Sequence, residues 1–219
     1  MRRVLLVVSV SVPILLAAVA TAVSAPKPPK TGQLTIAAKP NPITFGQTTT
    51  ISGKLKGAKA GIVVTLQQNR APYTGGYKTL VTTTTAQNGD YSFAGQRPTV
   101  SSRYRTTSQT PAATSSELLV PVRIRVSLRV SDTTPRSGQR VRFFGSARPQ
   151  HDGKRVRIQR QTATGWKTVA RVRLRDAGSE RSRYSSRLRV RRDAAYRARV
   201  YRDADHATGT STTKSLDAH

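Results

Sequence analysis

The feature that most constrains the fold of this chain is an internal repeat at an offset of 92 residues. Residues that recur at this offset include Gly46-Gln47 with Gly138-Gln139, Gly53 with Gly145, and Tyr104-Arg105 with Tyr196-Arg197. Self-similarity at one fixed period indicates a duplicated structural unit. Because only short insertions separate the matching blocks, we predict two copies of one domain, covering residues 33–122 and 123–216.

Both copies consist of short runs in which apolar and polar residues alternate between turn residues. Val64 and Leu66 show this alternation in the first copy, and Val156 and Ile158 show it at the matching places in the second. Alternation with period two places the apolar side chains on one face of a strand. The expected strands are 33–38, 47–55, 61–68, 77–85, 90–94, 102–108 and 116–122, then 125–131, 139–147, 154–161, 166–175, 183–191, 195–202 and 210–216. Seven short strands per copy predict an all-β fold of two tandem immunoglobulin-like β-sandwich domains.

The sequence predicts one tight turn, at Asn88-Gly89. Asn88-Gly89 separates the threonine run 82–85 from the strand residues 91–93. Asn and Gly both accept positive φ, which a tight two-residue hairpin turn requires. We therefore expect a β-hairpin at this position.

The first 24 residues are predicted to form a signal helix for export. Arg2 and Arg3 precede an apolar run from Val4 to Val23, and small residues follow it. This order is typical of a secretory signal peptide. The run is also about as long as the roughly 20 residues of a membrane-spanning helix, so an uncleaved anchor is the alternative, and it is the only membrane contact we expect. Residues 25–32 are an extended spacer, and the location expected for the protein is secreted or cell-surface.

The sequence layout resembles the Ig-like repeats of secreted actinobacterial proteins. The resemblance rests on Gly-Gln before the second strand, Gly-Asp-Tyr-Ser-Phe at 89–93 and Tyr-Arg at 104–105. It is similar also to the transthyretin-like modules attached to some carboxypeptidases. The second copy departs from the pattern, because the loop 176–180 replaces the Asn-Gly turn. The resemblance implies a spacer, adhesion or surface-binding role outside the cytoplasm.

The second copy carries most of the positive charge. The formal net charge of the chain is +28, and residues 122–219 contain 25 Lys and Arg against 8 Asp and Glu. Arginines there alternate with apolar residues. Because successive side chains of a strand point to opposite faces of the sheet, the arginines should lie on the outer faces of both sheets. The candidate polyanion-binding residues are Arg140, Arg142, Arg155, Arg157, Arg171, Arg173, Arg187, Arg189, Arg197 and Arg199.

Two interpretations of these arginines stay open. The first copy fills its strands with threonine, so a compositional bias of the gene does not explain the arginines of the second. Like charges on adjacent strands also destabilise a sheet, which an anion lying over them would relieve. We therefore expect an anionic polymer as partner: a cell-wall polymer, an acidic polysaccharide or extracellular nucleic acid bound without sequence specificity. The alternative is a structural or adhesion spacer with incidental charge.

The sequence offers little material for catalysis, metals or cofactors. With no cysteine, the chain has no disulfide, thiolate ligand or lipid-modified cysteine. Only Asp90 and Glu117 are acidic within 25–121, so no glycosidase-type carboxylate pair is available there. The run 203–206, Asp-Ala-Asp-His, has ligand-type residues but is expected to be a solvated turn. We expect a non-enzymatic protein without metal or cofactor.

Overall fold

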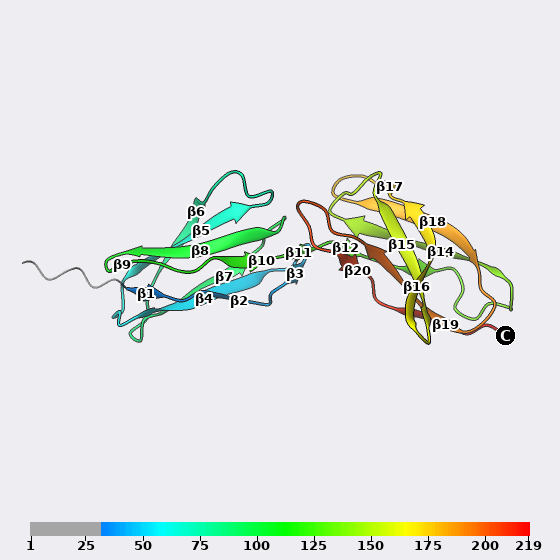
Figure 1. Cartoon of the computed structure of the whole chain (residues 1–219), viewed down its shortest axis with the longest axis horizontal. Coiled ribbons are helices and arrows are strands. Elements are labelled where there is room, and N and C mark those ends of the chain that lie inside the picture. Colours follow the sequence, from blue (N-terminus) through cyan, green and yellow to red (C-terminus); the bar gives the residue numbers. More distant parts are fainter. Residues whose placement is uncertain (1–31) are drawn as a thin grey trace, which may run out of the picture.

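The computed structural model describes residues 32–219, which form two β-sandwiches placed end to end (Figure 1). The predicted all-β fold class is confirmed, since this part of the chain contains strands and no helices. Within it, no helix has the length and hydropathy needed to cross a bilayer. The predicted signal segment 1–24 lies outside the described residues, as does all but the last residue of the spacer 25–32.

The first sandwich contains two antiparallel sheets. One sheet contains β1 (Gln33–Leu34), β2 (Ala37–Lys39), β4 (Thr49–Lys56) and β7 (Asp90–Gln96), with β4 at its centre. The other contains β5 (Val63–Arg70), β6 (Lys78–Thr84), β8 (Ser102–Gln109), β9 (Ala112–Thr114) and β10 (Leu118–Val120), in the order β10-β8-β5-β6 with β9 also on β8. This division of strands is an immunoglobulin-like arrangement.

The second sandwich repeats this plan. One sheet contains β12 (Arg125–Val126), β13 (Arg129–Val130), β14 (Arg140–Arg148), β17 (Arg175–Asp176) and β18 (Ser182–Arg189). The other contains β15 (Arg155–Thr162), β16 (Gly165–Arg173), β19 (Ala194–Val200), β20 (Gly209–Thr210) and β21 (Lys214–Leu216). The first and last predicted strands of each copy are broken into short pieces, because these strands lie at sheet edges and each piece pairs only locally with β3, β4, β8, β14 or β19.

Each sandwich has its own apolar core, built from the alternating residues. Leu66 and Tyr104 are fully buried in the first core, and Ile158 and Tyr196 take the matching places in the second. At about 25 cal/mol per Å² of buried apolar surface, such residues supply the main stabilisation of each sandwich. The repeat in the sequence is therefore a repeat of core positions.

A glycine and a tyrosine form a second repeated feature. Gly53 faces Tyr91 across β4 and β7, and the Tyr91 hydroxyl donates a hydrogen bond to the carbonyl of Thr35. Gly145 faces Tyr184 in the second sandwich, where the hydroxyl donates to the carbonyl of Ser127 at 2.7 Å. In both copies the tyrosine ring and the edge strand pass over the glycine, which leaves no room for a side chain.

The predicted hairpin at Asn88-Gly89 is wrong. The flanking strands belong to different sheets, since β6 pairs with β5 and β7 pairs with β4. The turn is present, with Gly89 at a φ of 83°. A Cβ at Gly89 would lie 2.3 Å from the carbonyl oxygen of Leu55. Glycine is thus required by its close approach to the backbone of β4, the strand with which β7 pairs, and not by a hairpin ladder.

The connection between the sandwiches is hydrogen-bonded on both sides. β11 (Val122–Arg123) pairs in parallel with β3 (Ile43–Thr44), a short strand that the sequence did not predict. Ala207, in the loop after β19, donates to the carbonyl of Val122 at 2.8 Å, and Ile124 donates to the carbonyl of Ala207 at 3.0 Å. Val122 belongs to the first core and Ile124 to the second. The two cores are therefore separated by a single residue.

Substitution of Gly145 by alanine should destabilise the second sandwich by about 1–3 kcal/mol, the usual cost of overpacking a filled site. The new Cβ would lie 2.0 Å from the carbonyl oxygen of Ser127 and 2.9 Å from the Tyr184 hydroxyl. Urea unfolding of the two proteins measures the difference. Gly75→Ala is the control, because nothing lies within 4 Å of its Cβ position. Equal stability of both variants would contradict this packing.

Candidate polyanion interface

The ten predicted arginines occupy two separate outer faces of the second sandwich. Four lie on β14 and β18: Arg140, Arg142, Arg187 and Arg189. Six lie on β15, β16 and β19: Arg155, Arg157, Arg171, Arg173, Arg197 and Arg199. The two sheets pack face to face, so their outer faces point in opposite directions. The structure therefore does not bring the ten residues together into one surface.

On the β15–β16–β19 face, three arginines lie side by side across the strands. Arg157 is paired in register with Arg171 on β16 and with Arg199 on β19. We name Arg157, Arg171 and Arg199 the arginine triplet. Directly opposed residues on adjacent strands have Cβ atoms about 4.5–5.5 Å apart. Arg155 and Arg173 form the next cross-strand pair and extend this positive surface.

An exposed tyrosine supports the triplet. The guanidinium carbon of Arg157 lies 4.3 Å from the ring centroid of Tyr201, and that of Arg199 lies 5.1 Å from it. A hollow of about 260 Å³ at this place is lined by Lys154, Arg155, Arg157, Arg171, Val200, Tyr201 and Arg202. Stacking on an aromatic ring holds a guanidinium in position by about 0.5–1 kcal/mol at an exposed site. The triplet is thus partly ordered before any ligand arrives.

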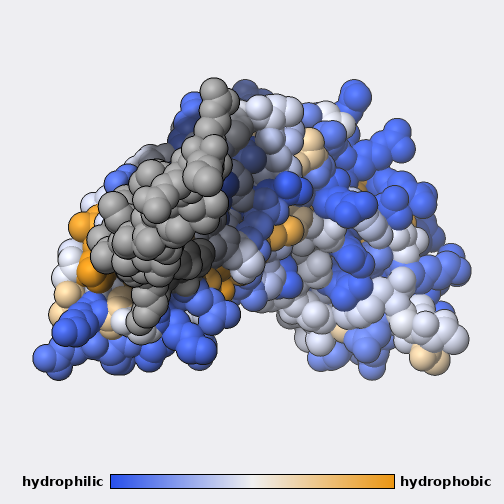
Figure 2. All heavy atoms as spheres, turned by 60° about the vertical axis from the view of Figure 1, so that its left-hand side comes forward, coloured by the Kyte–Doolittle hydropathy of each residue, from blue (hydrophilic) through white to orange (hydrophobic). Residues whose placement is uncertain are grey.

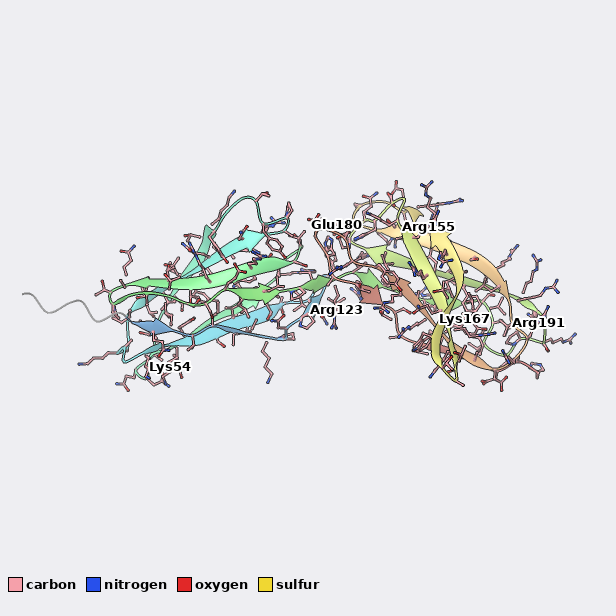
Figure 3. The ribbon with its side chains drawn as sticks, viewed as in Figure 1. Lys54, Arg123, Arg155, Lys167, Glu180 and Arg191 are labelled. Carbon is pink, nitrogen blue, oxygen red and sulfur yellow. The ribbon has the colours of Figure 1, made fainter. Side chains whose placement is uncertain are left out.

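No ion pair in the described part of the chain involves an acidic side chain and this surface. Among residues 32–219, the ion pairs are Lys54–Asp90, Arg103–Glu117, His151–Asp203 and His206–Asp203. None of these pairs contains an arginine of the second sandwich. Figure 2 shows hydrophilic side chains projecting over the visible face of this sandwich. Arg155, Lys167 and Arg191 follow its length from the junction toward the C-terminus (Figure 3).

The corresponding face of the first sandwich, formed by β5, β6 and β8, has threonines in place of the triplet arginines. Thr65 on β5 is paired with Thr82 on β6 and with Thr107 on β8. These threonines occupy the register positions of the arginine triplet in the duplicated sheet. The pair Val63 and Thr84 likewise replaces Arg155 and Arg173. The two copies thus provide one backbone with either arginine or threonine at matching outer positions.

Arg197 differs from the other candidates, because it has a structural counterpart in the first copy. Its Nε donates to Oε1 of Gln159 at 2.9 Å, and its guanidinium lies 4.1 Å from the ring centroid of Trp166. Burial, and then the neighbouring charge of Arg199, lower the pKa of the Arg197 guanidinium below its usual value. In the first copy, Arg105 makes the same contacts with Gln67 and Tyr77. Trp166 and Tyr77 are both half-buried.

The opposite face contains four cross-strand arginine pairs, of which Arg125 with Arg148 and Arg175 with Arg183 lie outside the ten predicted residues. Arg140 is paired with Arg189, and Arg142 is paired with Arg187. Arg142 lies 4.3 Å above the ring centroid of Phe144. No three arginines lie in register across three strands on this described face. Its arginines therefore lie in cross-strand pairs, without a row of three like the triplet.

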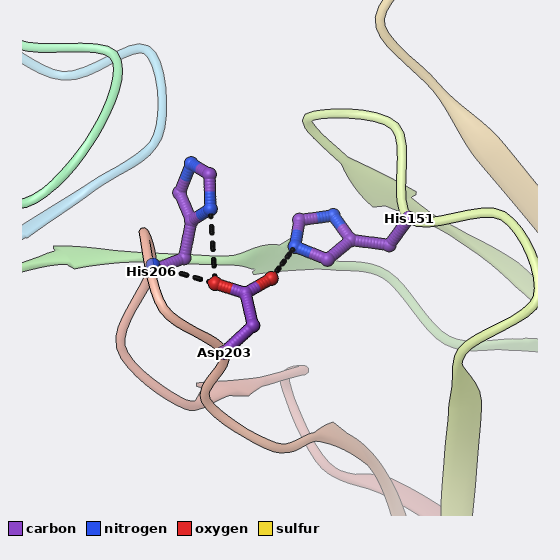
Figure 4. A group of neighbouring side chains, drawn as sticks. All are labelled: His151, Asp203 and His206. Carbon is purple, nitrogen blue, oxygen red and sulfur yellow. Dashed lines mark hydrogen bonds and ion pairs between the residues drawn. The ribbon is translucent and has the colours of Figure 1, made fainter. Parts of the chain in front are cut away.

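A side-chain cluster that the sequence did not predict lies at the junction of the sandwiches (Figure 4). His151, from the loop between β14 and β15, meets Asp203 and His206 from the loop between β19 and β20. His206 is 8% exposed and His151 is 6% exposed, so the prediction of a solvated turn at 203–206 is wrong. His151 is distant in sequence from the other two residues, and no local motif signals their contact. These residues are the group in the described chain with metal-ligand geometry.

Comparisons with known proteins found no matching family model and no matching curated protein. Among solved structures, the chain is similar to red sea bream transglutaminase at 12% identity and a TM-score of 0.47, covering 85% of this chain and 31% of that one. It is also similar to a tetra-tandem repeat in the extending region of a large adhesion protein, at 16% identity and a TM-score of 0.35, covering 85% of this chain and 49% of that one. The chain thus spans about a third and about half of their lengths. The resemblance to actinobacterial Ig-like repeats stays a prediction.

Replacing the triplet by the threonines of the first copy should reduce the salt dependence of stability. Each like-charge pair costs about 0.2–1 kcal/mol, and 1 M salt shortens the screening length to about 3 Å. The wild type should therefore gain more free energy of unfolding between 10 mM and 1 M NaCl than Arg157→Thr/Arg171→Thr/Arg199→Thr. Urea unfolding at both salt concentrations measures this gain.

The control is Arg129→Thr/Arg136→Thr/Arg191→Thr, which changes the net charge equally. Arg129 is paired with Phe144, and the other two lie outside strands. An equal loss of salt dependence in both variants would show that only net charge matters.

Proposed function

We propose that this protein is a non-catalytic, extracytoplasmic β-sandwich protein that binds anionic polymers through the arginine triplet and its surrounding face. The observation that supports the proposal is the difference between the copies at matching register positions. Arg157, Arg171 and Arg199 stand where the first copy has Thr65, Thr82 and Thr107. The fold tolerates threonine there, so the arginines are not needed to form the sheet.

The electrostatic energy of the face also supports a polymeric ligand. Charges on neighbouring strands lie well within the Debye length of about 8 Å at physiological ionic strength. They therefore repel one another, and no acidic residue within 32–219 pairs with them. A polymer with regularly spaced phosphate, sulfate or carboxylate groups can neutralise several arginines at once. A single small anion can neutralise only one or two.

Binding would use charge and hydrogen-bond geometry, without sequence readout. A guanidinium group forms two parallel hydrogen bonds with a phosphate or carboxylate. Neutralising charges along a polymer also releases its counterions, which makes the affinity strongly salt-dependent. Tyr201 is the exposed aromatic residue in the hollow, and the guanidinium groups of Arg157 and Arg199 lie over its ring. The site therefore lacks the free aromatic surface on which nucleic-acid bases stack.

A spacer or adhesion module is the second candidate function. The observation that favours it is the hydrogen-bonded junction, which joins the sandwiches end to end through β3, β11 and Ala207. Such a connection suits a rod that holds another part of the protein away from a surface. In that case the arginines serve solubility, and their replacement leaves ligand binding unchanged. Both candidate functions assume that the protein lies outside the cytoplasm, an expectation that rests on the predicted signal segment 1–24.

Binding of the full chain to fluorescently labelled long-chain polyphosphate tests the proposal. Compared with the wild type, Arg157→Thr/Arg171→Thr/Arg199→Thr should bind at least about tenfold more weakly at 0.15 M NaCl. The slope of log Kd against log salt should fall by roughly 2–3, since each phosphate-contacting cation contributes about one. Fluorescence anisotropy over 0.05–0.5 M NaCl gives both quantities.

Two further variants distinguish a specific face from net charge. Arg129→Thr/Arg136→Thr/Arg191→Thr has the same net charge as the triplet variant and should keep most of the affinity. Thr65→Arg/Thr82→Arg/Thr107→Arg, made in the triplet variant, should restore binding on the first sandwich. Equal weakening by both arginine-to-threonine variants would show that only net charge matters and would contradict a specific binding face, whereas unchanged binding in both would favour the spacer function.

A further inference from the structure

The cluster at the junction has an arrangement of ring nitrogens that hydrogen bonding within the protein does not explain. His151 Nε2 lies 2.9 Å from Oδ2 of Asp203, and His206 Nδ1 lies 3.4 Å from Oδ1. All three residues offer a ligand atom within 4.8 Å of the other two. Figure 4 shows both rings placed against one carboxylate. The cluster is independent of the arginine triplet and of the proposed function.

The other nitrogen of each ring is already engaged by a backbone carbonyl. His151 Nδ1 lies 2.7 Å from the carbonyl oxygen of Pro149, and His206 Nε2 lies 3.0 Å from that of Thr99. A carbonyl oxygen only accepts hydrogen bonds, so these two nitrogens must carry the protons. In each neutral imidazole, the nitrogen that faces Asp203 therefore has a lone pair and no proton.

Lone pairs that face a carboxylate need a cation between them. His151 Nε2 would otherwise place its lone pair against an anionic oxygen at hydrogen-bond distance. His206 Nδ1 is buried and has no hydrogen-bond partner among the described residues. The His206 side chain is more than nine-tenths buried, so bulk water does not solvate this nitrogen. Either a metal ion or a second proton on each ring would remove the conflict.

We propose that His151 Nε2, Asp203 Oδ2 and His206 Nδ1 bind a divalent transition-metal ion, with Zn²⁺ as the matching ion. Ligands about 2.0–2.1 Å from tetrahedral Zn²⁺ are about 3.4 Å apart. His151 Nε2 lies 2.9 Å from Oδ2 of Asp203, and one ligand atom from each of the three residues lies within 4.8 Å of the other two, which fits this spacing after small side-chain movements. Two imidazoles and one carboxylate leave a fourth position for water. The Asp203 side chain, which is 20% exposed, gives the ion access from solvent.

The surroundings of the cluster match those of metal-binding histidines. Such histidines donate their second ring N–H to a carbonyl or carboxylate, which fixes the tautomer, as Pro149 and Thr99 do here. Oδ1 of Asp203 accepts hydrogen bonds from the backbone N–H groups of His206 at 2.7 Å and Asp205 at 2.9 Å. Oδ2 is therefore the oxygen left for a metal ion.

The charge around the cluster also suits metal binding. Asp152, Asp203 and Asp205 also place acidic residues beside these histidines in the sequence, within an otherwise strongly basic half of the chain.

The choice of metal follows from the ligands. Ca²⁺ and Mg²⁺ prefer oxygen ligands, whereas imidazole nitrogen suits Zn²⁺, Cu²⁺ and Ni²⁺.

A structural role fits the position of the ion, because Thr99 belongs to the first sandwich and the three ligands belong to the second. Asp205 also accepts a hydrogen bond from Ser101 of the first sandwich at 2.8 Å. A bound ion would therefore hold two loops of the second sandwich against the end of the first.

Isothermal titration of the metal-stripped full chain with ZnCl₂ tests the proposal. The wild type should bind one Zn²⁺ saturably, and its Tm should rise as Zn²⁺ is added, because a ligand specific for the folded state stabilises it. Asp203→Asn keeps an oxygen that accepts the N–H groups, and His206→Gln keeps a polar side chain. Each should weaken Zn²⁺ binding by more than the 10–100-fold that loss of an outer partner costs.

His219→Gln is the matched control, because His219 is exposed and lies outside the cluster. It should bind Zn²⁺ as the wild type does. Co²⁺ provides a second measurement, since tetrahedral coordination by nitrogen and oxygen gives visible d–d absorption that disappears in Asp203→Asn and His206→Gln. Circular dichroism of each variant shows whether it has folded.

Three results would overturn the proposal. One is the absence of saturable Zn²⁺ binding by the folded wild type. Another is unchanged binding by both folded ligand variants, which would place the ion elsewhere. The third is NMR evidence that both rings carry two protons at neutral pH and keep them when Zn²⁺ is added. That result would assign the cluster to an imidazolium–carboxylate pair.

Discussion

The packing of alternating apolar residues between two sheets is the constraint on which the rest of this structure depends. Every second residue of a central strand must fill the core, as Leu66 and Ile158 do. The glycine-and-tyrosine contact of each copy fixes the edge strand over that core. Inner positions are therefore fixed in both copies, and differences between the copies fall on outer faces and in loops. The arginine triplet and the junction cluster occupy those two kinds of place.

The register between strands places three of the many arginines side by side and so forms the candidate site. Arg157 becomes the centre of a triplet only because β15 pairs with β16 on one side and with β19 on the other. The same pairing in the first copy unites threonines. The stack of Arg197 on Trp166 has its equivalent in both copies, so it belongs to the fold. Duplication thus separates the arginines that support the sandwich from those added to its surface.

The cluster of His151, Asp203 and His206 at the junction forms only because separate loops contact each other. The loop after β19 is longer than the matching loop after β8. It provides Asp203 and His206, and its backbone contacts both Val122 and the first sandwich. His151 reaches the same place from another loop. His206 also contacts the first sandwich, where the carbonyl oxygen of Thr99 lies 3.0 Å from its Nε2.

By itself, the sequence determined the duplication, the all-β class, the approximate strands and the outward direction of the arginines. These properties depend on local alternation and on one repeat period, which a linear sequence displays directly. Tertiary structure decided that the arginines divide between two faces, that β6 and β7 enter different sheets, and that His151 meets Asp203 and His206. Sheet partners and loop contacts join residues far apart in the chain. They are fixed only when the two sheets pack, so no local pattern in the sequence encodes them.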